Sequence, residues 1–394
     1  MPRHLLFASV MLLVQGLGTC ILYTRWLRPP IWPFGAKPLL LSLLCALCLA
    51  LPLGHFCWSR FQQPWAGALY WVGYLWLGLL FYAACAWVLS TLALGLLSVF
   101  WKPTLLVRQW VAAFLAFVTV GLCGYGAVVV WKGPRVVERE VVLEKLSPAF
   151  DGFRVAVISD MHLGMPLQGR AFSEQLVAKV NALDADVVAL LGDVVDGSLD
   201  SLAGAVEPLK NLRAKHGVLF VTGNHEYFNG PAAWVAHFKN LGFRVLGNER
   251  VEVERLELEH PQAEAAVPVR LAFAGVHDLY SGRMGEHRTD LRAALQGLDA
   301  QIPVVLLSHQ PRLWEEAREA GVDFMLSGHT HGGQMWPFSY VVARVNGYVQ
   351  GLYREGASQL YVTTGAGHWG PPIRVGAPPE IALLRLCAPS QQKQ

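Results

Sequence analysis

The chain reads FRVAVISDMH over residues 153–162 and FMLSGHTH over residues 324–331. In both stretches an apolar run of strand length, rich in β-branched residues in the first, leads into polar residues, which predicts a buried strand followed by a loop. Three similar junctions lie between them and end in Gly192-Asp193, Gly223-Asn224-His225-Glu226 and Ser308-His309. Together the junctions supply carboxylate, amide and imidazole groups, a donor mixture that suits divalent first-row transition metals. The pattern predicts a metal-dependent hydrolase.

The spacing within the junctions supports a shared site. Asp160 and His162 are separated by one residue, as are His329 and His331. Alternate residues of an extended segment point the same way, so Asp160 and His162 can reach one ion. One such pair occurs by chance in many proteins. Five junctions in order, each at the end of an expected strand, predict a binuclear metal centre.

The residues from about 133 onward have the pattern of a folded α/β domain, because strand and helix patterns alternate early and strands dominate later. Strands are expected at 136–146 (or a linker), 153–159, 186–191, 218–222, 244–246, 251–258, 271–276, 303–307, 324–327, 359–363 and 380–386. Helices are expected at 171–183, 202–213, 234–241, 291–298 and 312–320. Residues 259–268 read as a loop, and the glycine-rich residues 332–353 show little regular character. This order predicts two sheets covered by helices.

The first third of the chain differs sharply in composition. It holds no acidic residue before Glu138 and contains several apolar segments of membrane-spanning length. We expect about four spans, at 5–23, 38–56, 65–87 and 110–130, with five as the alternative because residues 65–101 contain no charge. Lys and Arg are balanced between the two sides, so the positive-inside rule gives no orientation. The sequence predicts a multi-pass integral membrane protein and leaves its membrane, sidedness and oligomeric state open.

Four regions follow from these patterns. They are a transmembrane region at 1–132, a linker or first strand at 133–150, a catalytic domain at 151–388 and a disordered tail at 389–394. The formal net charge of +3 is not accompanied by a Lys/Arg cluster, so it carries no nucleic-acid-binding signal.

The ordered motifs D-x-H, G-D, G-N-H-E, H and G-H-x-H, spread between Phe153 and Leu386, resemble the signature of the calcineurin-like metallophosphoesterase superfamily. The longer forms SDMHLG and SGHTHGGQ are similar to its membrane-associated, bacterial-type branch. The resemblance implies a four-layer αββα sandwich after the helical membrane region. It also implies two divalent ions per site, for which Mn, Fe and Zn all suit the donors.

The resemblance further implies a role for each motif residue. Its first metal would be held by Asp160, His162 and His331, its second by Asn224, His309 and His329, with Asp193 as the bridge. A metal-bridging hydroxide would attack the phosphorus, and His225 would serve the leaving oxygen. Glu226 stands where many members have Asp, at a position that supports the site without binding metal.

A few polar residues outside the motifs are weaker candidates. His368 and Arg374 are candidate substrate contacts, the latter because an arginine fork matches phosphate. Asp196 reads more readily as a loop cap than as a ligand. His277 and Asp278 would either line the site or form a turn.

These observations predict a membrane-anchored phosphoesterase whose partners are the lipid bilayer and a phosphorylated substrate. An anchored site meets lipid-borne substrates at high local concentration, so phosphodiesters or pyrophosphates of lipid-linked head groups are one expectation, with residues 334–353 admitting an acyl chain. The alternatives are a tethered protein or small-molecule phosphatase, and a non-catalytic membrane scaffold. Because every ligand position and His225 are present, an enzyme is favoured over a scaffold.

Overall fold

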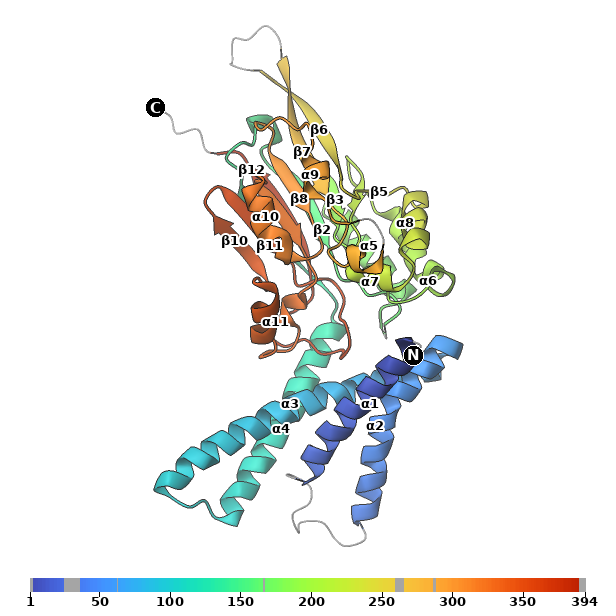
Figure 1. Cartoon of the computed structure of the whole chain (residues 1–394), viewed down its shortest axis with the longest axis vertical. Coiled ribbons are helices and arrows are strands. Elements are labelled where there is room, and N and C mark those ends of the chain that lie inside the picture. Colours follow the sequence, from blue (N-terminus) through green and yellow to red (C-terminus); the bar gives the residue numbers. More distant parts are fainter. Residues whose placement is uncertain are drawn as a thin grey trace. The chain divides into compact units, whose positions relative to one another are not determined.

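The structure, a computed structural model, describes residues 3–24, 36–61, 63–165, 167–258, 266–285 and 288–389. It divides into two compact units (Figure 1). The helical unit comprises Met1–Trp131 together with Gly370–Val375, and the α/β unit comprises Lys132–Trp369 together with Gly376–Gln394. A short loop from late in the sequence therefore belongs to the helical unit.

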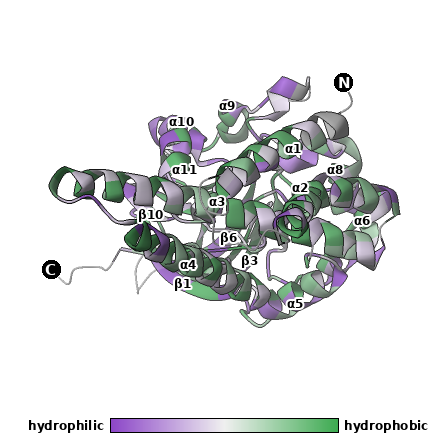
Figure 2. Ribbon diagram, turned by 90° about the horizontal axis from the view of Figure 1, so that it is seen from below, coloured by the Kyte–Doolittle hydropathy of each residue, from purple (hydrophilic) through white to green (hydrophobic). Residues whose placement is uncertain are grey.

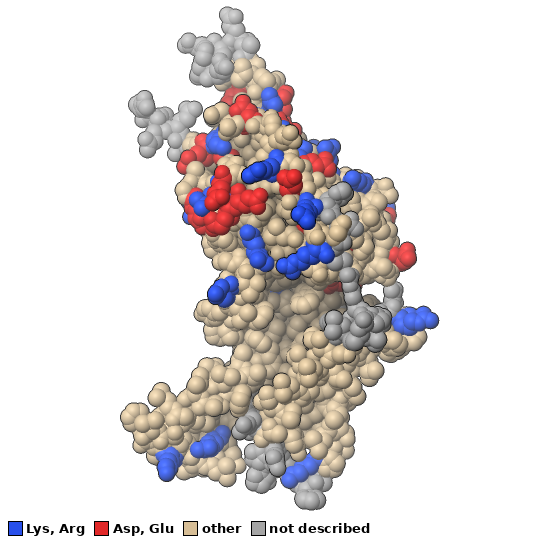
Figure 3. Space-filling model, viewed as in Figure 1, with Lys and Arg blue, Asp and Glu red and all other residues tan. Residues whose placement is uncertain are grey.

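The helical unit is built from α1 (Arg3–Leu22), α2 (Ala36–Phe61), α3 (Pro64–Phe100) and α4 (Leu105–Trp131). Three segments in it are long and apolar enough to cross a membrane, namely Lys37–Trp58, Trp65–Phe100 and Leu105–Trp131, while the apolar stretch Ala8–Leu22 of α1 is shorter. Hydrophobic residues line these helices in Figure 2, and Figure 3 shows Asp and Glu only on the α/β unit. The unit has the composition of a membrane anchor.

The charge-free stretch that left the number of spans open is one continuous helix. α3 extends well beyond the predicted span 65–87 and ends at Phe100. The predicted segments 38–56 and 110–130 lie within α2 and α4. The number of membrane spans and their orientation stay predictions.

The α/β unit contains two six-stranded sheets. The first has the order β1 (Arg135–Val142), β12 (Glu380–Cys387), β2 (Phe153–Ile158), β3 (Val187–Leu190), β4 (Val218–Phe220), β5 (Arg244–Val245). The second has the order β10 (Gly351–Glu355), β11 (Ser358–Val362), β9 (Phe324–Ser327), β8 (Val304–Leu307), β7 (Ala266–Gly275), β6 (Glu249–Leu258). The central strands β2 to β5 run parallel, as do β11, β9, β8 and β7.

Alternation along the strands divides the core into layers. In β2, Val155 and Val157 face the second sheet, whereas Ala156 and Ile158 face helices. The outer face of the first sheet is covered by α5 (Arg170–Asn181), α6 (Leu199–Val206) and α8 (Pro231–Asn240). The outer face of the second is covered by α9 (Leu291–Leu295) and α10 (Trp314–Glu319). The predicted αββα sandwich is confirmed.

Residues 332–353, expected to lack regular structure, include α11 (Ser339–Asn346) and the start of β10. This expectation was wrong because α11 buries none of its residues, and a helix without a buried stripe has no apolar periodicity to recognise. Of the expected loop 259–268, residues 266–268 belong to β7 and the rest lie outside the described residues. Residues 390–394 of the expected tail also lie outside them.

The topology explains how motifs far apart in the sequence meet. Asp160, Asp193 and Asn224 follow the parallel strands β2, β3 and β4, while His309 and His329 follow β8 and β9. Carboxyl ends of parallel strands lie at one edge of a sheet, where loops converge. Backbone bonds tie neighbouring loops together, since Asp160 N donates to Gly192 O (3.1 Å) and Gly328 N donates to His309 O (2.9 Å).

Candidate metal centre

The loops bring together two groups of metal-ligating side chains. One group is Asp160, His162 and His331, and the other is Asp193, His309 and His329. Within each group the ligand atoms lie within 4.8 Å of one another. Both groups consist of residues that the family resemblance implies as ligands. A third group that could hold a metal, His162, Asp196 and His225, shares His162 with the first.

Short distances between nitrogens characterise both groups. His162 Nε2 lies 3.0 Å from His331 Nε2, and His309 Nε2 lies 3.3 Å from His329 Nδ1. Imidazole nitrogens converging in this way suit a cation that all of them can ligate. His309 Nδ1 donates to Leu191 O at 2.7 Å, which fixes the ring orientation and directs Nε2 into the site.

Asp193 lies between the two groups. Its Oδ2 atom is 3.1 Å from His309 Nε2 in one group and 3.9 Å from His162 Nε2 in the other. A carboxylate in this position can contact two ions at once, as expected of a bridge.

The remaining motif ligand, Asn224, provides an independent test of whether the site fits a metal. Asn224 begins α7 (Asn224–Phe228), is buried, and its Oδ1 atom has no hydrogen-bond partner within the described structure. A buried acceptor without a donor is costly, and coordination to a cation would satisfy it. The donor set and the orphaned oxygen therefore both fit a binuclear metal site.

The candidate ligands are held in an uncommon backbone conformation. Five of them, Asp160, His162, Asp193, His329 and His331, have φ between +46° and +68°. Non-glycine residues adopt this left-handed region at a cost and concentrate there at functional sites, where the surroundings enforce it. The surrounding structure therefore holds the ligand side chains in place at the cost of a less favourable backbone conformation.

Glycines in the motifs permit the close approach of these loops. A Cβ atom on Gly328 would collide with the side chains of Ser159 and Asp160, and one on Gly223 would collide with Asp193. The glycine of G-N-H and that of G-H-x-H are thus needed for packing against the neighbouring ligand.

Glu226 supports the site without facing the ligands. Its buried carboxylate accepts backbone N–H groups from Gly223 (2.7 Å), Val194 (2.8 Å) and Asp193 (3.0 Å). Burial, together with the nearby charge of Asp193, raises the pKa of Glu226 to about 7. The residue joins the loops that carry Asp193 and Asn224.

Asp196 has a role that the sequence did not reveal. Its carboxylate accepts from His162 Nδ1 at 3.1 Å through one oxygen and contacts His225 Nδ1 through the other. It therefore orients a candidate ligand and the candidate leaving-group residue together. The signal available was a second Asp three residues after Asp193, which reads equally well as a loop cap.

Burial and nearby charges shift the pKa values of two histidines in the site in opposite directions. Burial opposes protonation of His225, but Asp196 and Asp193 outweigh it and raise its pKa to about 10. Burial and the adjacent His309 lower the pKa of His329 to about 3, so that ring is a neutral donor of its lone pair. Burial would raise the pKa of Asp193, but His309 and His225 hold it well below its usual range.

Two aromatic rings flank His225. Phe228, 41% exposed, packs edge-on with a ring-centroid distance of 5.2 Å, and Trp369, 50% exposed, does so at 5.9 Å. The imidazole thus reaches the surface between two apolar side chains.

The structure places the two weaker candidates differently. His368 is buried, and its backbone exchanges hydrogen bonds with the Gln168 side chain (3.1 Å each way), which also donates to His162 O. Gln168, which sequence reasoning missed, thereby joins the D-x-H loop to His368. Arg374 is also buried but belongs to the helical unit, where its backbone N donates to Gly126 O. Substrate contacts by His368 and Arg374 stay predictions.

His277 and Asp278 form a polar network beside β8. Tyr227 and His277 Nδ1 are 3.1 Å apart, while Asp278 accepts both of its bonds with Gln310 Nε2 at 2.9–3.0 Å. Burial raises the pKa of Asp278 to about 6. The network anchors the segment after His309, which is closer to the turn role than to a lining role.

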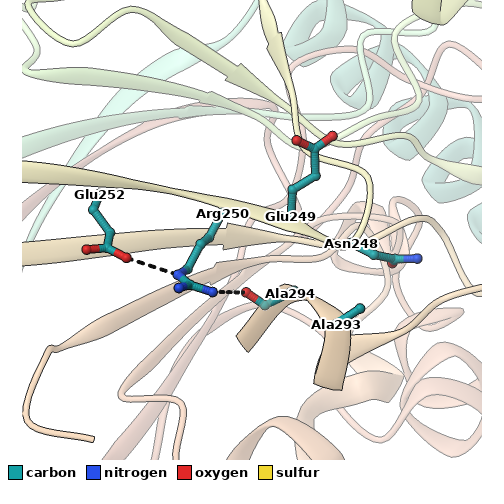
Figure 4. A pocket seen from close by; sticks show the side chains of 6 residues that line it. All are labelled: Asn248, Glu249, Arg250, Glu252, Ala293 and Ala294. Carbon is teal, nitrogen blue, oxygen red and sulfur yellow. Dashed lines mark hydrogen bonds and ion pairs between the residues drawn. The ribbon is translucent and has the colours of Figure 1, made fainter. Parts of the chain in front are cut away.

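A cavity in the α/β unit is formed by β6, the residue before it and α9. It measures about 390 Å³ and is lined by Asn248, Glu249, Arg250, Glu252, Ala293 and Ala294 (Figure 4). Arg250 is engaged there by Glu252 and by backbone carbonyls. No candidate metal ligand lines it.

Comparison with known proteins identifies the family of the α/β unit. Residues 153–333 match the family described as calcineurin-like phosphoesterase. A Helicobacter pylori uncharacterized metallophosphoesterase is 35% identical over 66% of this chain and 68% of its own length. An Aquifex aeolicus uncharacterized metallophosphoesterase is 32% identical over 64% of this chain and 91% of its own. A Danio rerio transmembrane protein with metallophosphoesterase domain is 34% identical over 71% and 63%.

The chain belongs to the calcineurin-like phosphoesterase family, as the order of its motifs predicts. It combines a metallophosphoesterase domain with apolar helices of membrane-spanning length. The name of the Danio rerio relative describes the same combination.

Proposed function

We propose that this protein is a membrane-anchored, binuclear metal-dependent hydrolase of phosphate esters. The observation that carries the proposal is the convergence of two buried donor groups on Asp193, with the orphaned Asn224 oxygen beside them. The family supports a metal-dependent phosphoester hydrolase, and the candidate ligands follow the ends of parallel strands in both sheets.

Asp160, His162 and His331 would hold one ion, and Asn224, His309 and His329 the other, with Asp193 shared. When bound, two such ions neutralise phosphate charge and activate a water for in-line displacement. The chain positions them through the left-handed loops and through the hydrogen bond from His309 to Leu191. Mn, Fe and Zn all fit these donors.

His225 would protonate or stabilise the leaving oxygen. Asp196 contacts its Nδ1 atom, and its Nε2 atom lies 3.9 Å from Asp193 Oδ2, on the side of the candidate ligands. The raised pKa keeps the proton available near neutrality. His225 N also donates to Asp193 Oδ1 at 2.8 Å, which fixes the residue relative to the proposed bridge.

The finer part of the proposal is a lipid-linked substrate, either a phosphodiester or a pyrophosphate. Two observations support it. The chain carries helices suited to a bilayer, and the half-exposed rings of Phe228 and Trp369 offer apolar surface on both sides of His225. An apolar leaving group would gain contact there that a water-soluble phosphate would not.

The test uses the full chain in lipid nanodiscs with added Mn²⁺. Hydrolysis of bis-p-nitrophenyl phosphate and p-nitrophenyl phosphate is measured beside Asp193→Asn. Metal-dependent turnover that the variant loses is expected, and the preferred ester separates diesterase from monoesterase. Two bound metals without turnover of either soluble ester would favour a membrane-dependent substrate, and absence of turnover on the lipid ester as well would favour the scaffold alternative.

The lipid part is tested separately. Dioleoylglycerol p-nitrophenyl phosphate in the nanodisc is compared with methyl p-nitrophenyl phosphate in solution. A higher kcat/KM for the lipid ester is expected. Equal efficiency would contradict a lipid substrate and favour a tethered small-molecule phosphatase.

A further inference from the structure

An exposed apolar surface stands out on the α/β unit, over and just before α11. Its members, which we name the α11 face, are Trp336, Phe338, Tyr340, Val341 and Val345, with exposed fractions from 46% to 70%. None of the residues of α11 is buried, so the helix contributes nothing to the domain core. Soluble proteins seldom cluster large exposed apolar side chains unless the surface binds something.

The arrangement is that of an amphipathic interfacial segment. At about 100° per residue, Tyr340, Val341, Arg344 and Val345 fall within an arc of about 140° on α11. Arg344 is exposed among the apolar members, where a long basic side chain can extend to a phosphate head group. Between Asp323 and Glu355 there is no acidic residue, so no carboxylate in this stretch repels an anionic surface.

The α11 face also lies close, within the α/β unit, to the point where the chain leaves the helices. α4 ends at Trp131 and β1 begins at Arg135, whose N donates to Pro379 O at 3.1 Å. Gly376, three residues before Pro379 and hence within about 10 Å along the chain, forms a bridge with Met335. Trp336 follows directly, so the apolar surface and the anchor attachment share one end of the unit.

We propose that the α11 face inserts into the head-group and acyl boundary of the bilayer that the apolar helices cross, with Arg344 at anionic lipid phosphate. A three-residue linker connects this end of the unit to α4, and an interfacial helix binds through buried apolar area and basic charge. The occupant of the surface is therefore lipid and not a second protein.

Insertion here would act on the candidate active site through Gln334. Its Nε2 donates to Trp369 O at 2.9 Å and its Oε1 accepts from Trp369 N at 3.1 Å. Trp369 is the ring that packs against His225. The segment that leads into the α11 face is thus tied by one side chain to Trp369, the apolar flank of His225. This last step rests on the proposed function, whereas lipid contact does not.

The contact is tested by photocrosslinking in the full chain, reconstituted in nanodiscs of phosphatidylcholine and phosphatidylserine. A benzoylphenylalanine replaces Tyr340 in one sample and Leu256 in the control. Leu256 is 69% exposed and belongs to β6. Figure 1 shows β6 and α11 toward opposite ends of the α/β unit. Lipid adducts are expected at position 340 and not at 256. Absence of adducts at 340, or equal adducts at both positions, would overturn the proposal.

The functional consequence is tested with Val341→Asp/Val345→Asp, beside Leu256→Asp/Leu258→Asp as the matched control. The α11 pair should lower turnover of the lipid ester about tenfold because carboxylates resist insertion, and leave the water-soluble ester unchanged. Equal loss on both esters, or loss in the control pair, would overturn the link. If the parent hydrolyses neither ester, the proposed function fails while the crosslinking result still decides lipid contact.

Discussion

The strand-end loops and the α11 face differ in almost every physical respect, although His331 and Trp336 are only five residues apart. The loops bury polar side chains in a left-handed backbone, and each group is fixed by several partners. The α11 face exposes apolar side chains on an ordinary helix that no core residue holds. In both regions residues depart from the usual rule of polar outside and apolar inside. These departures support the two ligands that we propose, a cation in the loops and lipid at the α11 face.

The largest effect is expected at the point shared by the two donor groups. Asp193→Asn removes the charge that lies near both His309 and His162, so we expect bound metal to fall and turnover to drop at least about a thousandfold. Metal content by mass spectrometry and ester hydrolysis measure the two effects. Asp184→Asn is the matched control, because Asp184 is an exposed Asp that also has a positive φ. Full metal content in Asp193→Asn would contradict the bridging role.

His225→Ala should separate chemistry from metal binding. Loss of a group that serves the leaving oxygen costs about 10²–10⁴ in rate, while both metal groups keep their ligands. We expect full metal content with strongly reduced kcat, and a smaller loss for an ester with a better leaving group. Metal loss in this variant would show that His225 is itself a ligand.

Gly328→Ala tests whether the loops depend on close approach. The added Cβ would meet Ser159 and Asp160, so the ligand loops must separate, and metal affinity should fall about 10–100-fold. Gly204→Ala is the control, because a Cβ there meets nothing within 4 Å. Unchanged metal affinity in Gly328→Ala, measured by competition with a chelator, would show that the loops can accept the added Cβ atom without displacing the ligands.

Asp196→Asn should change the pH profile more than the maximal rate. His225 serves as a proton donor only in its protonated form. Burial lowers the pKa of His225, but Asp196 and Asp193 outweigh it and raise this pKa to about 10. Removing the negative charge of Asp196 lowers the pKa of His225, so the alkaline fall in kcat should move to lower pH. Profiles of parent and variant at equal metal load measure the shift. An alkaline limb that stays in place would contradict the pairing.

The smallest effect is expected for stability at the α11 face. Val345→Thr alters an exposed residue without a core contact, so the free energy of unfolding should change by less than about 0.5 kcal/mol. By contrast, Trp314→Ala in the core beneath the second sheet should cost about 3–5 kcal/mol. Thermal unfolding in detergent compares the two. A large loss in Val345→Thr would show that the face packs within the protein.

The sequence predicted the two regions with unequal success. The loops were foreseen because β2, β3, β8 and β9 are apolar runs that end abruptly at polar motifs, and the family resemblance ordered the motifs into two metal sites. α11 was missed because none of its residues is buried. Apolar residues recur at helical spacing only where one face of a helix packs against a core. The role of Asp196 was missed because its contact with His225 spans 29 positions and depends on where two loops meet.

The helical unit was predicted from its composition, and only in part. Composition was sufficient to foresee an apolar anchor, but it could not divide residues 65–101, since no charge or helix break marks a boundary before Trp101. The grouping of Gly370–Val375 with the helices could not be foreseen either, because nothing local to that loop distinguishes it from a surface turn.

The most direct test of the central claim is the metal stoichiometry of the full chain, purified and equilibrated with limiting Mn²⁺ or Zn²⁺, then measured by mass spectrometry against protein concentration. Two converging donor groups predict two ions per chain, with the second lost in His309→Ala and the first retained. A folded chain that binds no metal would contradict the account.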